Sequence, residues 1–178
     1  AQQYIGDYTA AKDAVTSLYE ILDTTCTINP EDSETTGHKA TNIKGKVEFR
    51  NVTFSYSTSP DKIILDNISF TINPGQKIAF VGASGSGKST IVQLIERFYD
   101  CNSGTILIDD IDIKDYDLIS LRKHIGIVMQ EPVLFKRGIY ENIKYGKLDA
   151  TEEEILEAAR NANIEELLSK DFNNDKDL

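Results

Sequence analysis

Residues 82–90 constrain the fold of this 178-residue chain more than any other segment. Their letters, GASGSGKST, match G-x-x-x-x-G-K-(S/T), the pattern of a loop that wraps phosphate groups. The apolar residues 78–81 before it predict a buried strand, and residues 89–99 after it carry apolar side chains at helical spacing. The sequence therefore predicts a strand, a phosphate-binding loop and a helix, as at the start of an α/β fold.

The residue types of this loop suit a polyanion. Glycines at positions 82, 85 and 87 allow left-handed backbone angles and a close approach to phosphates. The N-terminus of the following helix adds unpaired N–H donors. Lys88 supplies a mobile positive charge, and the hydroxyl of Ser89 is an oxygen ligand suited to Mg²⁺. A plain Gly/Ser-rich turn is the alternative, but it does not require every fixed position of the motif.

Charge is distributed unevenly along the chain. The net charge of −10 comes from residues 1–44, with 3 basic and 7 acidic side chains, and from residues 147–178, with 4 and 10. Residues 45–146 hold 12 of each. No basic patch indicates DNA or RNA as a partner. Cys26 and Cys101 form neither a disulfide framework nor a metal-binding pattern.

The first 44 residues are expected to be distinct from the rest. Apolar side chains recur every three or four residues from 4 to 22, which predicts a helix, and residues 24–37 form a polar, acidic linker. The apolar stripe of this helix packs either on a partner outside the chain or back on the core. The only methionine is Met129, so we expect a piece of a longer protein. No apolar run approaches the ~20 residues that span a bilayer.

Short strands and helices are predicted beyond residue 45. Residues 47–54 alternate in polarity with a break near Asn51 that indicates a bulge, and Thr151 with Glu154 forms a capping box at the start of a last helix. The other expected elements are strands at 63–66, 68–72, 105–109 and 125–129, a turn at 73–76 and a helix at 117–122.

Motifs along the chain occur together in the order of a known family. They are Phe54-Ser55-Tyr56, Ile64-Leu65, Pro74-Gly75, the phosphate loop, Phe98-Tyr99-Asp100, Ser103-Gly104, Leu121-Arg122, residues 127–135, Tyr140-Glu141-Asn142-Ile143 and the spaced set in 151–163. Over about residues 45–168 the chain resembles the nucleotide-binding domain of an ATP-binding cassette (ABC) transporter, in the multidrug-resistance (P-glycoprotein-like, subfamily B) exporter branch. The resemblance implies that residues 1–44 are a helix and linker from a transmembrane domain. Residues 45–178 would be the N-terminal part of the nucleotide-binding domain, ending before the signature motif.

The resemblance also assigns roles to single residues. Tyr56 would stack on adenine, an interaction worth about 1–3 kcal/mol, although a half-buried tyrosine at a strand end is the plainer interpretation. Ile64 would pack near the adenine or ribose, Thr90 would lie near the α-phosphate, and Gln130 would reach Mg²⁺ or the attacking water. The implied nucleotide-binding set is Tyr56, Ile64, Gly82, Ser84, Gly85, Ser86, Gly87, Lys88, Ser89, Thr90 and Gln130, with Ser89 and Gln130 as the metal-binding pair.

For function, the resemblance implies the ATP-binding portion of an ATP-driven membrane exporter. The parent protein would be an ATPase of the membrane, with this domain on the cytosolic side. Its partners would be transmembrane domains and a second nucleotide-binding domain, in the same or another chain. No residue of this chain matches the family's Walker B aspartate, catalytic glutamate, signature or switch histidine, so the chain alone is expected to be nearly inactive. The implied fold is an antiparallel β subdomain beside a mostly parallel P-loop core.

A rival interpretation concerns residues 105–110. This apolar run ends in Asp109, which would be the Mg²⁺ carboxylate of a small self-contained P-loop kinase or GTPase-like switch. The sequence contains no Asn-Lys-x-Asp motif for guanine, which disfavours the switch. In the exporter family the same stretch is a hairpin, usually with glycine where Asp110 stands, and aspartate tolerates the left-handed backbone that such a turn needs.

Overall fold

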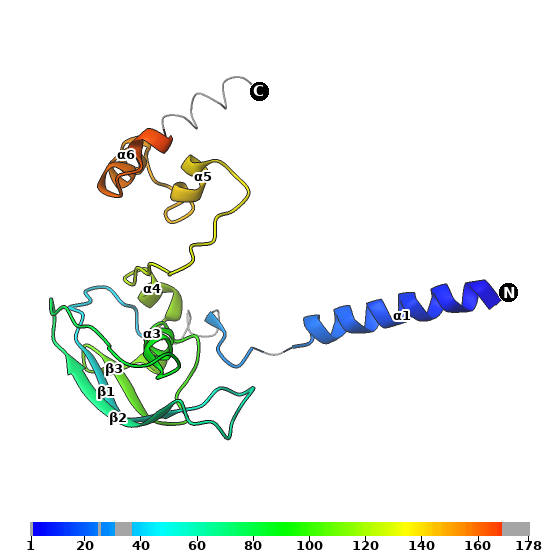
Figure 1. Cartoon of the computed structure of the whole chain (residues 1–178), viewed down its shortest axis with the longest axis horizontal. Helices are drawn as coiled ribbons and strands as arrows, with labels where there is room; N and C mark the ends of the chain where they lie inside the picture. The colour runs from blue at the N-terminus through cyan, green and yellow to red at the C-terminus, as the bar shows by residue number, and fades with distance from the viewer. Residues whose placement is uncertain (1, 25, 31–36, 169–178) are drawn as a thin grey trace. The chain divides into compact units, whose positions relative to one another are not determined.

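A computed structural model of the chain describes residues 2–24, 26–30 and 37–168, with residues 2–10 described by their backbone alone. The chain divides into two compact units, Ala1–Gly126 and Ile127–Leu178 (Figure 1). In the first unit the elements are α1 (Gln2–Leu22), β1 (Val47–Phe54), β2 (Leu65–Ile72), α3 (Lys88–Ile95), β3 (Ser103–Ile108), β4 (Ile111–Asp112), η1 (Ile113–Asp115) and α4 (Leu118–Arg122). The second unit contains α5 (Ile139–Lys144) and α6 (Glu152–Asn161).

The first unit is built on a four-stranded antiparallel sheet in the order β2-β1-β3-β4 (Figure 1). This sheet confirms the predicted strands at 47–54 and 105–109. Of the strand expected at 63–66, only Leu65 and Asp66 are in a strand, and they continue into the strand expected at 68–72 as β2, with a positive φ of 47° at Asn67. The turn at 73–76 is confirmed, since the Gln76 N–H donates to the Asn73 carbonyl at 3.0 Å and Gly75 has φ 72°.

The predicted bulge in β1 lies at Asn51, which has φ 50° and interrupts the pairing register with both neighbouring strands. The extra residue changes the alternation, so that Phe49 and Val52 are both buried on the core side. Gly104 faces the bulge from β3 with φ 85°, and a Cβ there would overlap the carbonyl of Asn51. The bulge therefore keeps an apolar face toward the core and requires glycine opposite it.

The core of the first unit lies between this sheet and its short helices. Its buried members are Ala40, Phe49, Val52, Phe54, Leu65, Ile91, Leu94, Ile106, Ile108, Ile113, Tyr116 and Leu121. Fully burying one large aliphatic or aromatic side chain contributes roughly 1.5–3 kcal/mol. Ile91 and Leu94 come from α3, so the helix that follows the phosphate loop is fixed to the sheet by core packing.

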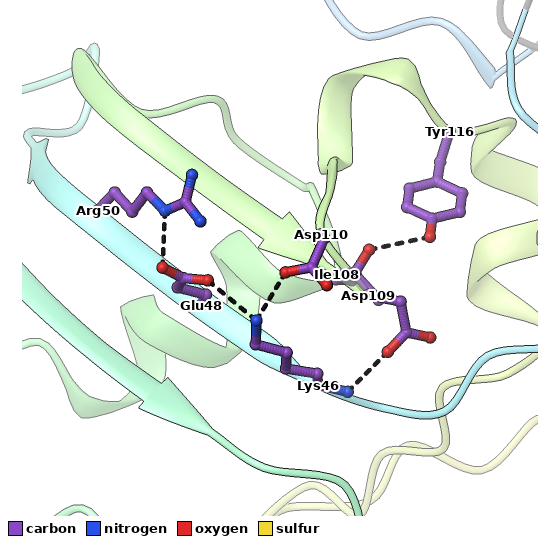
Figure 2. Close-up of polar contacts among 7 residues, drawn as sticks. All are labelled: Lys46, Glu48, Arg50, Ile108, Asp109, Asp110 and Tyr116. Carbon is purple, nitrogen blue, oxygen red and sulfur yellow. Dashed lines mark hydrogen bonds and ion pairs between the residues drawn. The ribbon is translucent and has the colours of Figure 1, made fainter.

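The β3–β4 hairpin settles the geometry around Asp109 (Figure 2). Asp109 and Asp110 have φ values of 50° and 67°, the left-handed pair that a two-residue I′ turn needs. The Asp109 carboxylate accepts hydrogen bonds from the backbone N–H groups of Lys44 at 2.6 Å and Lys46 at 2.9 Å. Burial alone would raise the pKa of Asp109, but these N–H donors outweigh burial and lower the pKa. The expected hairpin is present, and the side chain of Asp109 accepts hydrogen bonds from the backbone that leads into β1.

Residues 38–40, which we call the strap, are hydrogen-bonded to residues in the range 115–124. Its four bonds run from His38 N to Asp115 O at 2.6 Å, Asp117 N to His38 O at 3.0 Å, Ala40 N to Ser120 Oγ at 2.9 Å, and between His124 Nε2 and Ala40 O at 2.8 Å. The helix predicted at 117–122 is confirmed as α4, with Asp117 as its N-cap. Of the predicted linker at 24–37, residues 25 and 31–36 lie outside the described part.

Two predicted strands are wrong. Residues 78–81 and 125–129 have no strand structure, and Val81 and Val128 are 94% and 98% exposed. A β-strand satisfies its backbone N–H and C=O groups through neighbouring strands. In the described residues no strand pairs with either segment, so their apolar composition is not sufficient to form a strand.

In the described residues of the second unit, α5 and α6 pack together. Ile155 and Ala159 of α6 and Leu168 are its buried centre, with Ile139 and Ile143 of α5 against them. The predicted capping box is confirmed in both directions. The Thr151 side chain accepts from the Glu154 N–H, and the Glu154 carboxylate accepts from the Thr151 N–H.

Helix α1 confirms the helix predicted at 4–22. Its described side chains, residues 11–22, are exposed, so within the described ranges this part of the helix does not pack on the core. None of the helices in the described part of the chain is long and apolar enough to cross a bilayer.

Candidate phosphate-binding site

The site begins where the chain turns from the loop into α3. Gly87 is the N-cap, with φ 86° and ψ 7°, and a Cβ there would lie 2.6 Å from Leu65 Cδ2. Only glycine therefore allows α3 to start against β2 in this way. The first turn of α3 carries no acidic residue. Its leading N–H groups have no partners within the helix, and the positive end of the helix dipole lies there, which favours an anion.

The loop itself is compact. Gly85 adopts φ 80°, as the phosphate-loop pattern predicts. Gly82 has no positive φ, contrary to expectation. A Cβ at Gly82 would lie 2.7 Å from Ser86 Oγ, so this glycine provides space inside the loop and not an unusual backbone angle.

Lys88 extends over the inside of the loop. Its Nζ donates to the carbonyls of Gly82 at 2.9 Å and Ala83 at 2.8 Å, and lies 3.3 Å from Ser86 Oγ. The ammonium thus lies against the backbone carbonyls at the start of the loop. A phosphate group entering the loop would meet this ammonium together with the N-terminus of α3.

The same segment carries four hydroxyl side chains. Ser84, Ser86 and Ser89 are exposed, whereas Thr90 is only 4% exposed. The hydroxyl of Ser89 stands in the first turn of α3, where it suits Mg²⁺ as an oxygen ligand. Among the described residues no cluster of three or more His, Cys, Asp or Glu could hold a metal. A magnesium ion here fits Ser89 together with phosphate oxygens, a common arrangement for this ion.

Tyr56, just beyond β1, lies against α3. Its hydroxyl lies 2.9 Å from Thr90 Oγ1 and donates to Gln93 Oε1 at 2.8 Å. The ring makes edge contacts with Phe54 at 5.0 Å and with Tyr99 at 5.2 Å between centroids. Tyr56 and Tyr99 also border a pocket of about 290 Å³. Tyr56, which is predicted to stack on adenine, is therefore hydrogen-bonded directly to Thr90, which is predicted to lie near the α-phosphate.

The other two predicted site residues differ in position. Ile64 lies beside the loop, since its carbonyl and Cγ2 would be 3.2 Å from a Cβ at Gly87. Gln130 is exposed and belongs to the second unit, so its part in the site stays a prediction. The first unit thus brings together Tyr56, Ile64 and the whole loop.

Sequence reasoning did not identify Gln93. It lies one helical turn after Thr90 on α3, and residues three apart share a face of a helix. That spacing would have placed Gln93 near Thr90. The bond to Tyr56 could not be found this way, because the two residues are 37 positions apart.

The fold and the site define a protein of the P-loop nucleotide-binding class. The defining features are the helix capped by Gly87, the loop contacted by the Lys88 ammonium, and the antiparallel sheet beside them. Residues 65–177 match the family described as "ABC transporter". The chain is 48% identical over 167 residues to ABC transporter B family member 17 of Arabidopsis thaliana, and 45% identical over 156 residues to member 6. The chain belongs to the ABC transporter family.

A solved structure supports the same conclusion for the fold. The "Structure of a bacterial Atm1-family ABC exporter with ATP bound" matches with a TM-score of 0.76 and 38% identity, over 87% of this chain and 26% of that one. The matches to members 17 and 6 cover 92% and 88% of this chain. The chain spans only 13% and 11% of the length of those relatives.

Proposed function

We propose that this chain binds Mg-ATP and is the ATP-binding portion of an exporter of the multidrug-resistance type. The observation that carries the proposal is the position of Lys88, whose ammonium lies over the backbone of a glycine-bounded loop at the N-terminus of α3. A cation and a helix N-terminus aimed at one position favour a polyanion.

The residues of the first unit have separate tasks in this proposal. The loop and Lys88 hold the phosphates, Thr90 approaches the α-phosphate, and Tyr56 with Ile64 contacts the adenosine. Ser89 would hold Mg²⁺, and the metal-binding role of Gln130, which belongs to the second unit, stays a prediction. An Mg²⁺ ion held at Ser89 would supply positive charge that offsets the negative charge of the phosphates.

The proposal extends to the whole protein. We infer a membrane protein in which this domain lies on the cytosolic side, contacts transmembrane domains and pairs with a second nucleotide-binding domain. Relatives that carry the family name support this inference. ATP hydrolysis is assigned to the parent. No residue of this chain takes the role of the Walker B aspartate or the catalytic glutamate, so slow turnover is expected from the chain alone.

Titration with fluorescent ATP in the presence of Mg²⁺ tests the proposal. Lys88→Ala should weaken binding roughly 10- to 100-fold, because hydrogen bonds to a charged group contribute about 1.5–3 kcal/mol. Lys123→Ala, at an exposed lysine outside the loop, is the matched control and should bind normally. Equal affinity of the Lys88→Ala variant and the unaltered chain would overturn the proposal.

A further inference from the structure

The hydroxyl of Tyr56 takes part in two hydrogen bonds with α3, and their direction can be worked out. The amide oxygen of Gln93 only accepts, so the single phenol proton of Tyr56 is donated to it, at 2.8 Å. The contact of 2.9 Å with Thr90 must then be made with the Thr90 hydroxyl as donor. The order of donation is therefore Thr90 to Tyr56 to Gln93.

This order has a consequence for the loop. Thr90 has one hydroxyl proton, and in this structure it is given to Tyr56. A phosphate oxygen that accepts the Thr90 proton would take it away from Tyr56. The bond to Gln93 does not compete with phosphate, so it is the bond that can keep the phenol in place when a nucleotide is bound.

We propose that Gln93 is a positioning residue for Tyr56, which fixes the ring for the base of a bound nucleotide. The inference rests on the proposed function and adds a residue that sets base affinity. Phe54 and Tyr99 make T-shaped contacts with the Tyr56 ring, and Gln93 fixes its hydroxyl end. A ring held before binding loses less side-chain freedom on stacking.

The proposal separates Gln93 from the phosphate-binding residues. A residue that acts through Tyr56 should affect ATP, which has a base, and leave tripolyphosphate unaffected. The measured quantity is the ratio of the two dissociation constants, tripolyphosphate over ATP, both with Mg²⁺. Any change in the phosphate loop cancels in this ratio.

The experiment uses the 178-residue chain with Gln93→Ala, Gln93→Glu, Tyr56→Phe and the double variant Gln93→Ala/Tyr56→Phe. Gln93→Ala and Tyr56→Phe should each lower the ratio roughly 3- to 10-fold. The double variant should lower it no further, since both changes remove the same bond. Gln93→Glu keeps an acceptor at the same length and should keep the ratio within about 3-fold of the unaltered chain. Val92→Ala, at the neighbouring exposed position of α3, is the control.

Several results would overturn the inference. They are an unchanged ratio in Gln93→Ala, an equal loss of ATP and tripolyphosphate binding, or additive effects of Gln93→Ala and Tyr56→Phe. If Gln93→Ala does not melt cooperatively, it is not folded, and the ratios of the Gln93→Glu and Tyr56→Phe variants test the proposal instead. A low ratio in Gln93→Glu then contradicts the proposal. Failure of the unaltered chain to bind either probe overturns the proposed function itself, which is a different outcome from normal ATP binding by Gln93→Ala.

Discussion

Strand β1 and residues 78–81 both belong to the first unit, but they differ in backbone pairing and in burial. β1 is hydrogen-bonded to β2 on one side and to β3 on the other, and its Phe49 is 1% exposed. Residues 78–81 have no strand partner in the described part of the chain, and Val81 is 94% exposed. Residues 78–81 are apolar throughout, whereas β1 alternates in polarity, so backbone pairing and not apolar content distinguishes the strand.

Phe70 of β2 links the two regions. Its ring stacks on Phe49 at 4.5 Å and meets the edge of Phe80 at 5.5 Å between centroids. Phe80 is 36% exposed in spite of this contact. A single aromatic contact therefore holds a side chain near the core, but it does not convert the surrounding backbone into a strand.

The largest expected effect on stability comes from truncating Phe49, and the matching truncation of Phe80 is its comparison, since both rings contact Phe70. Phe49→Ala should lower the free energy of unfolding by about 3–5 kcal/mol, because it leaves a cavity in a closed core. Phe80→Ala should lower it by less than about 1.5 kcal/mol, the range of an aromatic pair. Urea unfolding measures both, and equal losses would show that residues 78–81 are as firmly held as β1.

Asp109 tests what holds the start of β1 in place. Asp109→Asn should lower the free energy of unfolding at neutral pH by about 1–3 kcal/mol, since one anionic acceptor for the N–H groups of Lys44 and Lys46 is lost. The pKa of Asp109 is lowered in the folded chain, so this stability is fully present above its ordinary pKa of 3.8 and disappears as the pH falls through the folded value. The gap between the two proteins should close in acid, and a gap that is independent of pH would contradict this role.

The same substitution addresses the rival function. Asp109→Asn should leave Mg²⁺-dependent nucleotide binding intact, because its carboxylate is engaged with the backbone of residues 44–46. Loss of that binding in a folded Asp109→Asn protein would favour the small kinase or switch instead.

Glu96, the C-cap of α3, is a buried carboxylate in the first unit. It is 8% exposed, and its Oε2 has no hydrogen-bond partner in the described residues. Burial raises the pKa of Glu96, and the charge of Arg122 only partly opposes this. The carboxylate thus destabilises the fold at neutral pH, and this penalty is absent below its ordinary pKa of 4.5. Glu96→Gln should raise the free energy of unfolding by about 1 kcal/mol at pH 7, and melting curves that show no gain at neutral pH would be the contrary result.

The smallest effect on stability is expected at the exposed valines. Val81→Lys and Val128→Lys should each change the free energy of unfolding by less than about 0.5 kcal/mol. Both should reduce self-association measured by light scattering, because they interrupt exposed apolar segments. A large destabilisation would mean that these side chains are buried in solution.

Local sequence signals predicted the elements that depend on nearby residues. The bulge at Asn51, the left-handed backbone of Gly87 and the capping box of Thr151 each follow from backbone preferences or short-range hydrogen bonds. The strands expected at 78–81 and 125–129 failed because strand formation depends on partners that apolar composition cannot supply. The bond from Tyr56 to Gln93 was missed because it joins residues distant in sequence, which only the packing of β1 against α3 brings together.

The strap at residues 38–40 has a mechanical consequence. Its four bonds lead to residues 115–124, while the chain continues from it into β1. Tension applied to the chain ahead of His38 would load the η1–α4 segment directly and reach the sheet only after those bonds had yielded. The strap would therefore carry a pull arriving from the N-terminal side to the stretch that immediately precedes residues 125–130.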